Sequence, residues 1–155
     1  MSNTKMLLES IQNNLNEEDL EEQKMIKRIE EATGYDLEEC KRIYEDGEYI
    51  FFPGVEDDFN LGKAYVDMVG FEGVANLSNF IDRNAIKTNI INNMNSEEDY
   101  SDEELDAMVE EDIALAIDSK AEDYLKEYFD YDHLGHTLGY EGYTFIEDGC
   151  IGIFA

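Results

Sequence analysis

The chain has 155 residues, 43% of them hydrophobic and 12% aromatic, which suffices for one domain or two small ones with a buried core. Its 39 acidic residues against 11 basic ones give a net charge of −28. Such a surface repels phosphate groups, which argues against direct binding to nucleic acid or to an anionic membrane.

Two further features of the composition narrow the class of protein. No apolar run approaches the roughly 20 residues of a membrane span, so we expect no membrane association. The two cysteines, Cys40 and Cys150, fit a reduced cytoplasmic protein better than a disulfide scaffold.

Capping residues and apolar spacing indicate helices in the first half of the chain. Asp36 with an acid three residues later is typical of a helix N-terminus, and Gly34 of the end of the preceding helix. An Asp-Gly turn and Pro53-Gly54 enclose an apolar run that is typical of a strand. The predicted elements are helices at 4–14, 17–32, 36–45 and 59–69, and a strand at 49–52.

The second half of the chain begins with apolar spacing typical of a helix. Polar residues then indicate a loop that ends at Ser101, where Glu104 completes a capping-box pattern. Near the C-terminus, Asp148-Gly149 between two alternating runs predicts a β-hairpin. The predicted elements are a helical stretch at 77–90, a loop at 92–100, helices from 101 and at 121–129, irregular chain through 139, and strands at 142–146 and 150–154.

These elements predict a helix-rich α+β fold with a small antiparallel sheet. The apolar faces give a list of residues that we expect in the core: Tyr49, Phe51, Leu61, Met68, Phe80, Ile81, Ile113, Phe129, Leu134 and Phe145. Residues 77–90 and 125–138 share the pattern Leu-x-x-aromatic-apolar-Asp, 48 residues apart. Two helix-to-turn units of similar build would explain this repeat, and chance would also explain it.

No arrangement of residues indicates catalysis, so we expect a non-enzymatic protein without a cofactor or metal. His133 and His136 are more typical of a surface turn than of a metal site. Asp130, Asp132, Gly135 and Glu141 match four positions of a calcium loop, but Leu134 and Leu138 stand where oxygen ligands are needed. A calcium-responsive binding protein is therefore our least favoured hypothesis for the function.

The acidic residues are concentrated in two regions. Residues 31–60 hold 10 acids and 2 bases, residues 61–95 hold 3 of each, and residues 96–155 hold 19 acids and 2 bases. If helical, the segment 97–112 would span about 24 Å and carry on the order of 0.4 charges per Å, against roughly 0.6 for duplex DNA. Its acids are Glu97, Glu98, Asp99, Asp102, Glu103, Glu104, Asp106, Glu110, Glu111 and Asp112.

Several short motifs resemble the ArdA antirestriction family. Tyr128-Phe129-Asp130-Tyr131-Asp132, with Gly135 and the hairpin that follows, resembles the C-terminal end of that family. The runs 46–53 and 61–66 resemble its middle part, and the acidic stretch 92–118 is an insertion by comparison. The sequence has His136-Thr137 where the family has Arg-Asp, and helices where the family has a β-rich N-terminal domain.

The resemblance implies an elongated acidic protein, built of two small ArdA-like modules behind an N-terminal helical segment, that imitates DNA. We divide the sequence into that helical segment (1–33), a middle module (34–95) and an acidic helix with a C-terminal module (96–155). The expected surface comprises the acids of 97–112 together with Glu38, Glu39, Glu45, Asp46, Glu48, Glu56, Asp57 and Asp58.

The leading hypothesis is an inhibitor, borne by a phage or mobile element, that acts in the cytoplasm of a bacterial host. Its carboxylates would occupy the DNA channel of a defence enzyme, first a type I restriction-modification complex and second an RNA-guided nuclease. It would bind that enzyme and no nucleic acid, and a homodimer is one option for its own assembly. The second hypothesis is an acidic interaction or regulatory module without a nuclease target.

Overall fold

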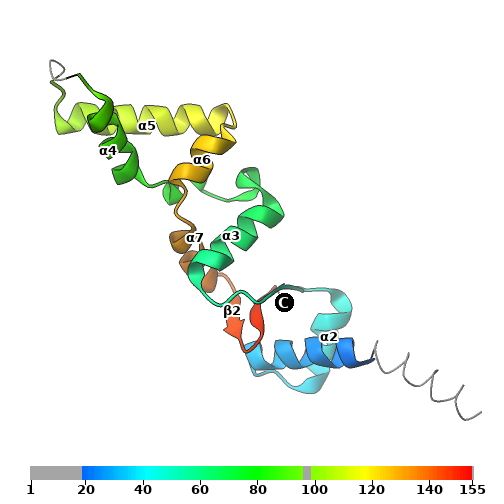
Figure 1. The fold of residues 1–155 in the computed structure, drawn as a ribbon. Coiled ribbons are helices and arrows are strands. Elements are labelled where there is room, and N and C mark those ends of the chain that lie inside the picture. The colour runs from blue at the N-terminus through cyan, green and yellow to red at the C-terminus, as the bar shows by residue number, and fades with distance from the viewer. Residues whose placement is uncertain (1–18, 96–98, 155) are drawn as a thin grey trace, which may run out of the picture. The chain divides into compact units, whose positions relative to one another are not determined.

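A computed structural model describes residues 19–95 and 99–154, so the helix predicted at 4–14 lies outside the described residues. The chain forms two compact units, whose described residues are 19–56 with 139–154 in the first and 57–95 with 99–138 in the second. These units cut across the three sequence segments, because the C-terminal hairpin pairs with a strand near residue 50. Figure 1 labels the helices α2 to α7 and the strand β2.

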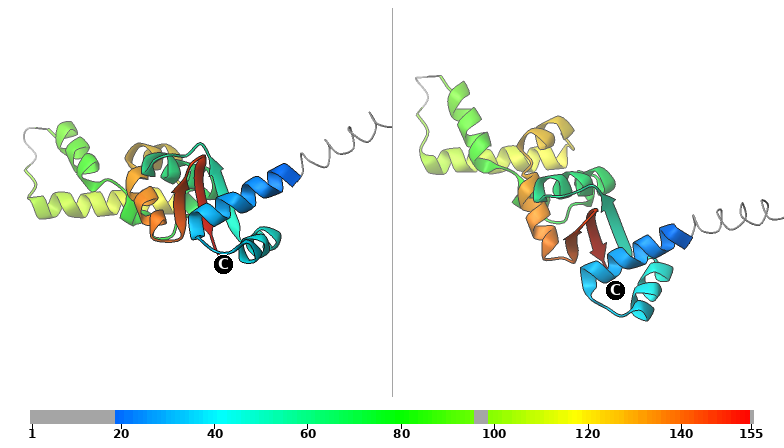
Figure 2. Two further views of the ribbon diagram at one scale, coloured as in Figure 1. Left: turned by 90° about the horizontal axis from the view of Figure 1, so that it is seen from below. Right: turned by 60° about the horizontal axis from the view of Figure 1, so that its bottom comes forward.

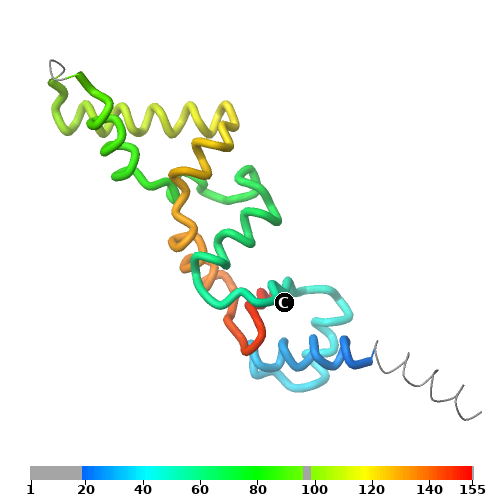
Figure 3. The backbone as a smooth tube through the Cα atoms, viewed as in Figure 1, coloured from blue at the N-terminus to red at the C-terminus, as the bar shows by residue number. Residues whose placement is uncertain are grey.

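The first unit combines two helices with a three-stranded sheet. Residues 19–33 are helical, and α2 spans Leu37–Asp46. The strands β1 (Tyr49–Pro53), β2 (Tyr143–Ile146) and β3 (Gly149–Ile153) form an antiparallel sheet in the order β1-β3-β2. The chain path in Figure 3 shows how the C-terminal hairpin brings β3 against β1. The helix-rich α+β class and the predicted hairpin are confirmed.

Local sequence determines where α2 begins and ends. The Asp36 side chain accepts a hydrogen bond from the backbone N–H of Glu39 at 2.9 Å, as the capping pattern predicts. Gly47 follows the helix with φ of 66°, a left-handed conformation that glycine adopts without strain. The chain therefore turns directly from α2 into β1.

The core of the first unit lies between the two helices and one face of the sheet (Figure 2). Ile29, Ile43 and Ile151 are fully buried there. Arg28 lies at the edge of this core, with Nη2 2.7 Å from the Asp148 carboxylate and its guanidinium 4.3 Å from the centre of the Phe51 ring. This arginine ties the helix of residues 19–33 to the hairpin turn.

The second unit is helical. Its elements are α3 (Asp58–Val69), the 3-10 turns η1 (Phe71–Gly73) and η2 (Leu77–Phe80), α4 (Arg83–Asn93), α5 (Asp102–Asp118), α6 (Glu122–Tyr128) and α7 (Tyr131–Gly139). The helical stretch predicted at 77–90 is interrupted at Ile81, because Asp82 caps a new helix by accepting from the N–H of Ala85. The predicted loop at 92–100 is also shorter, since α4 continues to Asn93.

The two copies of the sequence repeat, 77–90 and 125–138, form similar segments that contact each other. Ile81 and Phe129 form an antiparallel bridge. The N–H of Asp82 donates to the Tyr128 carbonyl at 2.7 Å, and the N–H of Asp130 donates to the Phe80 carbonyl at 2.6 Å. Asp82 and Asp130 each cap the helix that follows. The two copies thus share a helix-to-turn build and pair with each other through their last residues.

Residues 130–139, predicted as irregular, are mostly helical and form α7. The Asp130 carboxylate accepts from the N–H of His133 at 3.0 Å, which starts this helix. A glycine in the middle of this segment lowers its helix propensity, so the sequence pattern did not indicate a helix. Gly135 is required by packing instead, because a Cβ atom there would lie 1.8 Å from the carbonyl oxygen of Asp58 in α3.

Most of the predicted core is confirmed, with two exceptions. Met68 is 45% exposed, because the buried side of α3 passes through Leu61, Gly62 and Val66 and leaves Met68 at its border. Phe145 is 41% exposed, because β2 is an edge strand of the sheet. Tyr49 and Phe51 are half-buried against the core of the first unit. None of the helices in the described ranges is long and apolar enough to cross a membrane.

Candidate functional site: the acidic surface of α5

The helix α5 contains most of the concentrated acids, and its start is fixed by Ser101. The backbone N–H of Glu104 donates to the Ser101 hydroxyl at 3.2 Å, which confirms the predicted cap. Asp102, Glu103 and Glu104 form the first turn, where the helix dipole favours negative charge. Part of the acidic run therefore stabilises the helix that presents it.

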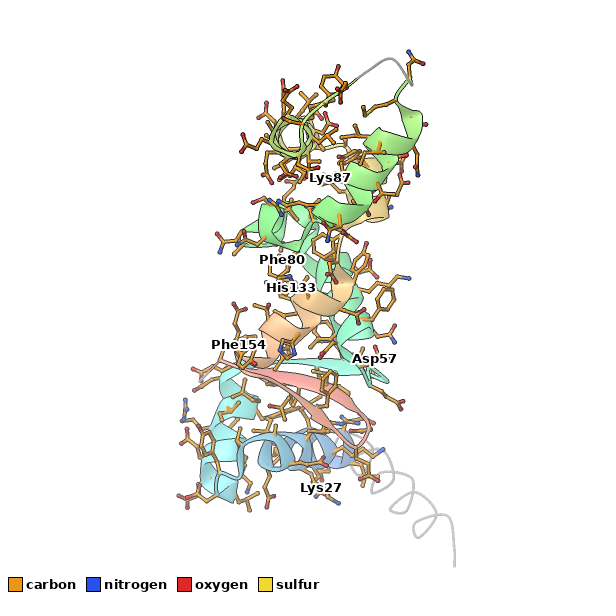
Figure 4. All side chains as sticks on the ribbon, turned by 90° about the vertical axis from the view of Figure 1, so that its left-hand side faces the viewer. Lys27, Asp57, Phe80, Lys87, His133 and Phe154 are labelled. Atoms are coloured by element: carbon orange, nitrogen blue, oxygen red, sulfur yellow. The ribbon has the colours of Figure 1, made fainter. Side chains whose placement is uncertain are left out.

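A buried stripe determines which side of α5 faces the protein. Leu105, Val109, Ile113 and Ala116 are buried, and they recur at intervals of three and four residues along one side of the helix. The helix contacts α4, α6 and η2 through this side. Figure 4 views α5 nearly end-on, with its side chains radiating around the axis. The orientation divides the acids of α5 into two groups.

The first group, which we call the inner row, comprises Asp102, Asp106 and Glu110. Lys87 of α4 places its Nζ atom 3.1 Å from the Asp106 carboxylate and 3.6 Å from that of Asp102. Arg83, one turn earlier on α4, pairs with Glu110. The two basic residues of α4 therefore pair with all three acids of the inner row and reduce its charge from −3 to −1, which the sequence pattern did not predict.

The electrostatics of the inner row follow from these pairs. The hydrogen bond from Arg83 lowers the pKa of Glu110, and the hydrogen bond with Asp106 raises the pKa of Lys87. Arg83 also donates to the Ser78 carbonyl at 2.8 Å, so it joins α5 to the turn before α4. The ion pairs of the inner row thus stabilise the packing of α5 against α4.

The second group, which we call the outer face, comprises Glu103, Glu104 and Glu111. All three are exposed, and none forms an ion pair within the described ranges. Asp118 lies seven residues after Glu111 and so shares this side of the helix. The sequence analysis missed Asp118, although this spacing could have identified it. The outer face is the part of α5 whose charge is available to a partner.

The remaining acids of the predicted array are placed differently. Asp112 lies at the border towards α6, where burial and the charge of Asp112 raise the pKa of Tyr124 to about 12. Asp99 is exposed and precedes the helix. Glu97 and Glu98 lie outside the described residues. The conditional length of about 24 Å for one helix over 97–112 therefore does not apply, because the helix starts after Ser101, as its capping pattern predicts.

The charge density of α5 in the structure is lower than the value expected from the sequence. Residues 102–118 contain eight acids, and with Arg83 and Lys87 the net charge is −6. At ~1.5 Å per residue the helix is about 26 Å long, which gives roughly 0.2 charges per Å. Duplex DNA carries roughly 0.6 charges per Å. The helix alone is thus less than half as densely charged as the duplex.

The second acidic region is largely engaged in local structure. Arg42 pairs with Glu39, Asp46 and Glu48, and its hydrogen bond lowers the pKa of Glu39. Of the other predicted residues of this region in the first unit, Glu38, Glu45 and Glu56 are exposed and form no ion pair with described residues.

The last two acids of that region belong to the second unit. Asp57 caps α3 by accepting from the N–H of Asn60 at 2.8 Å. Asp58 lies 3.5 Å from Nδ1 of His136. The region therefore does not form one continuous array within a single unit.

The family-motif residues are structural. Tyr128 and Phe129 are buried, and the Phe129 ring lies 5.3 Å from that of Phe71. Asp130 caps α7, and Gly135 permits the close contact with α3. Tyr131 packs on the Phe59 ring at 5.6 Å, and Asp132 is exposed. The motif thus stabilises the second unit and contributes little to its surface.

The near-match to a calcium loop is excluded by the backbone, because most of its positions lie in α7. The His133 ring packs against Phe80, with ring centres 4.8 Å apart, and both side chains are labelled in Figure 4. Across residues 19–95 and 99–154, no group of three or more His, Cys, Asp or Glu side chains is arranged to hold a metal ion.

Comparisons with protein-family models, with curated proteins and with solved structures found no match to this chain.

Proposed function

We propose that the protein is a DNA-mimic inhibitor of a host defence enzyme that binds DNA. A type I restriction-modification complex is the first candidate target, and an RNA-guided nuclease is the second. The observation that supports this most directly is the outer face of α5, where Glu103, Glu104 and Glu111 are exposed and form no ion pair with described residues, while the inner row pairs with Arg83 and Lys87. The resemblance of the motif at 128–138 to the ArdA family supports the same proposal, with two ArdA-like modules as the finer description of the fold.

The mechanism follows from charge. Carboxylates of the outer face would take the place of phosphates and pair with Lys and Arg residues of the enzyme's DNA channel. Those basic residues release bound counterions when they pair, as they do with DNA, so affinity should fall log-linearly with salt concentration. The inhibitor itself would contact no nucleic acid, because its net charge is −28.

The experiment is an inhibition assay with two triple variants of equal charge. The outer variant is Glu103→Gln, Glu104→Gln and Glu111→Gln. The inner variant is Asp102→Asn, Asp106→Asn and Glu110→Gln, which removes the same number of charges from the same helix. Because each interfacial charge pair can couple by more than about 1 kcal/mol, the outer variant should inhibit at least tenfold less well.

The control separates charge from fold. The inner variant should keep most of the inhibition, since its carboxylates already face Arg83 and Lys87. Circular dichroism should give the same helix content for both variants and the parent. Equal inhibition by the parent and the outer variant, or binding that duplex DNA does not displace, would refute the proposal.

One observation favours a second candidate function, an acidic interaction module without a nuclease target. Leu115 is 65% exposed on α5, and the charge density of this helix is below that of duplex DNA. An exposed leucine beside carboxylates suits a partner that offers an apolar contact between basic residues. Such a partner would bind without competition from DNA, which separates the two candidates.

A further inference from the structure

The strand β2 is an edge of the sheet in the first unit, because the strand order is β1-β3-β2 (Figure 2). The Gly142 carbonyl accepts a hydrogen bond from the N–H of Ile153 at 3.1 Å, which shows which residues of β2 face β3. Backbone groups alternate in direction along a strand, so the N–H and C=O of Phe145 point away from β3. Neither group forms a hydrogen bond within residues 19–95 and 99–154.

The two edges of this sheet differ. Native edge strands are commonly protected from pairing with other chains by a charged side chain, a proline or a bulge. On β1 the Glu48 carbonyl and the Gly54 N–H bond towards the hairpin, so Pro53 lies at an outward position and offers no donor. The run Tyr143–Ile146 of β2 has no proline and no charged side chain. The edge of β2 is therefore the one that can accept another strand.

The side chains of β2 leave this edge accessible. Thr144 and Phe145 are exposed, and both residue types favour the extended backbone of a sheet. An extended segment laid along β2 would satisfy the outward backbone groups of Phe145 and cover part of its side chain. Strand addition to an exposed edge is an established way for proteins to bind extended segments.

Charge at the two ends of β2 restricts the kind of segment. Glu141 precedes the strand and Glu147 follows it, and both are exposed and form no ion pair in the part of the chain that the structure describes. Glu31 also lies at the turn, because its Oε1 atom accepts from the N–H of Glu147 at 3.3 Å. These carboxylates, on a chain of net charge −28, favour a basic segment and repel an acidic one.

We propose that the edge of β2 binds an extended basic segment of a partner protein by strand addition. The segment adds a fourth strand to the sheet, pairs with the N–H and C=O of Phe145, and places a lysine or arginine near Glu141 and near Glu147. Exposed charge pairs and a short strand contribute little affinity, so we expect a dissociation constant of about 0.1–1 mM for an isolated segment. This site belongs to the first unit and uses none of the outer face of α5, so its test is independent of the proposed function.

The test is an NMR titration of the full chain with a synthetic peptide of about seven residues, the length of the run from Glu141 to Glu147. The peptide alternates valine and threonine between two terminal lysines. A second peptide carries N-methyl groups on its central backbone nitrogens, so it keeps both lysines but cannot pair as a strand. A third peptide has glutamates in place of the lysines.

Two variants of the protein test the same edge from the other side. Phe145→Pro removes the outward N–H without removing a bond to β3, since this N–H does not take part in that pairing. Phe145→Val is the matched control, because it changes the side chain and keeps the N–H. Circular dichroism confirms that each variant is folded, and the N-methylated peptide tests strand pairing on the parent protein itself.

We expect the lysine peptide to bind at about 0.1–1 mM and to slow hydrogen exchange of the Phe145 amide. The N-methylated peptide should bind at least tenfold less well, as should the lysine peptide to Phe145→Pro, whereas Phe145→Val should stay within about threefold of the parent. Binding that survives N-methylation overturns strand addition, and equal binding of the glutamate peptide overturns the basic segment as occupant. Absence of binding up to about 5 mM overturns the proposal as a whole. A Phe145 amide that is already protected in the free protein also overturns it, because another segment or a second copy then occupies this edge.

Discussion

Replacement of Gly135 by alanine tests the helix crossing that holds the second unit together. The added Cβ atom would lie 1.8 Å from the carbonyl oxygen of Asp58 and 2.5 Å from its carbonyl carbon. A carbon atom needs roughly 3.4 Å or more from such atoms, so α7 and α3 would have to separate by about 1.5 Å. Gly62 makes the reciprocal contact, because its Cβ would lie 2.1 Å from the Tyr131 carbonyl oxygen.

The expected magnitude combines two opposing effects. Overpacking costs typically 1–3 kcal/mol and occasionally more, and the clash with backbone puts Gly135→Ala at or above the upper end of that range, at about 3 kcal/mol or more. Alanine is favoured over glycine in a helix by about 1 kcal/mol. We therefore expect a net loss of about 2 kcal/mol or more. At ~2–4 °C per kcal/mol for a chain of this size, the melting temperature should fall by roughly 4–8 °C.

Gly139 in the same helix provides the control. No atom lies within 4 Å of a Cβ built there, and its φ is not positive. Gly139→Ala should therefore leave the protein unchanged or stabilise it by up to about 1 kcal/mol. Urea denaturation followed by circular dichroism measures both variants. If Gly135→Ala were as stable as the parent, or if both variants shifted in the same direction, the described packing of α3 against α7 would be incorrect.

Two further predictions concern titratable groups. Arg83 lowers the pKa of Glu110 below its ordinary value of 4.5, so this pair contributes stability above that pH and loses it as the pH falls. Because the pair is exposed, Glu110→Gln should cost only about 0.5 kcal/mol at pH 7, and the cost should shrink as the pH falls below 4.5 and through the lowered pKa of this carboxyl. Urea titrations over this pH range measure the cost, and a loss that does not change with pH would contradict the pairing. Burial raises the pKa of the Cys40 thiol, and both cysteines are fully buried, so neither should react rapidly with a thiol reagent until urea unfolds the protein. Rapid labelling of Cys40 in native buffer would contradict the packing of the first unit.

The starts of two helices and one hairpin turn could be predicted, because each depends on residues that are close together in the sequence. Asp36 and Ser101 cap their helices as predicted, because an N-cap needs only a side-chain oxygen and the N–H group three residues on. The Asp148-Gly149 turn was likewise predicted from a short pattern. The concentration of acid in α5 is also a property of the sequence alone.

Contacts between distant residues could not be predicted from those patterns. Gly135 lowers the helix propensity of its segment, yet α7 forms because the glycine allows contact with Asp58, 77 residues earlier. The pairing of Arg83 and Lys87 with the inner row depends on how α4 packs beside α5, and that packing decides which acids remain available. The number of acidic and basic residues is thus a property of the sequence alone. Tertiary packing decided which of these charges face solvent and which face the protein, because the elements packed against a helix determine which of its sides is buried.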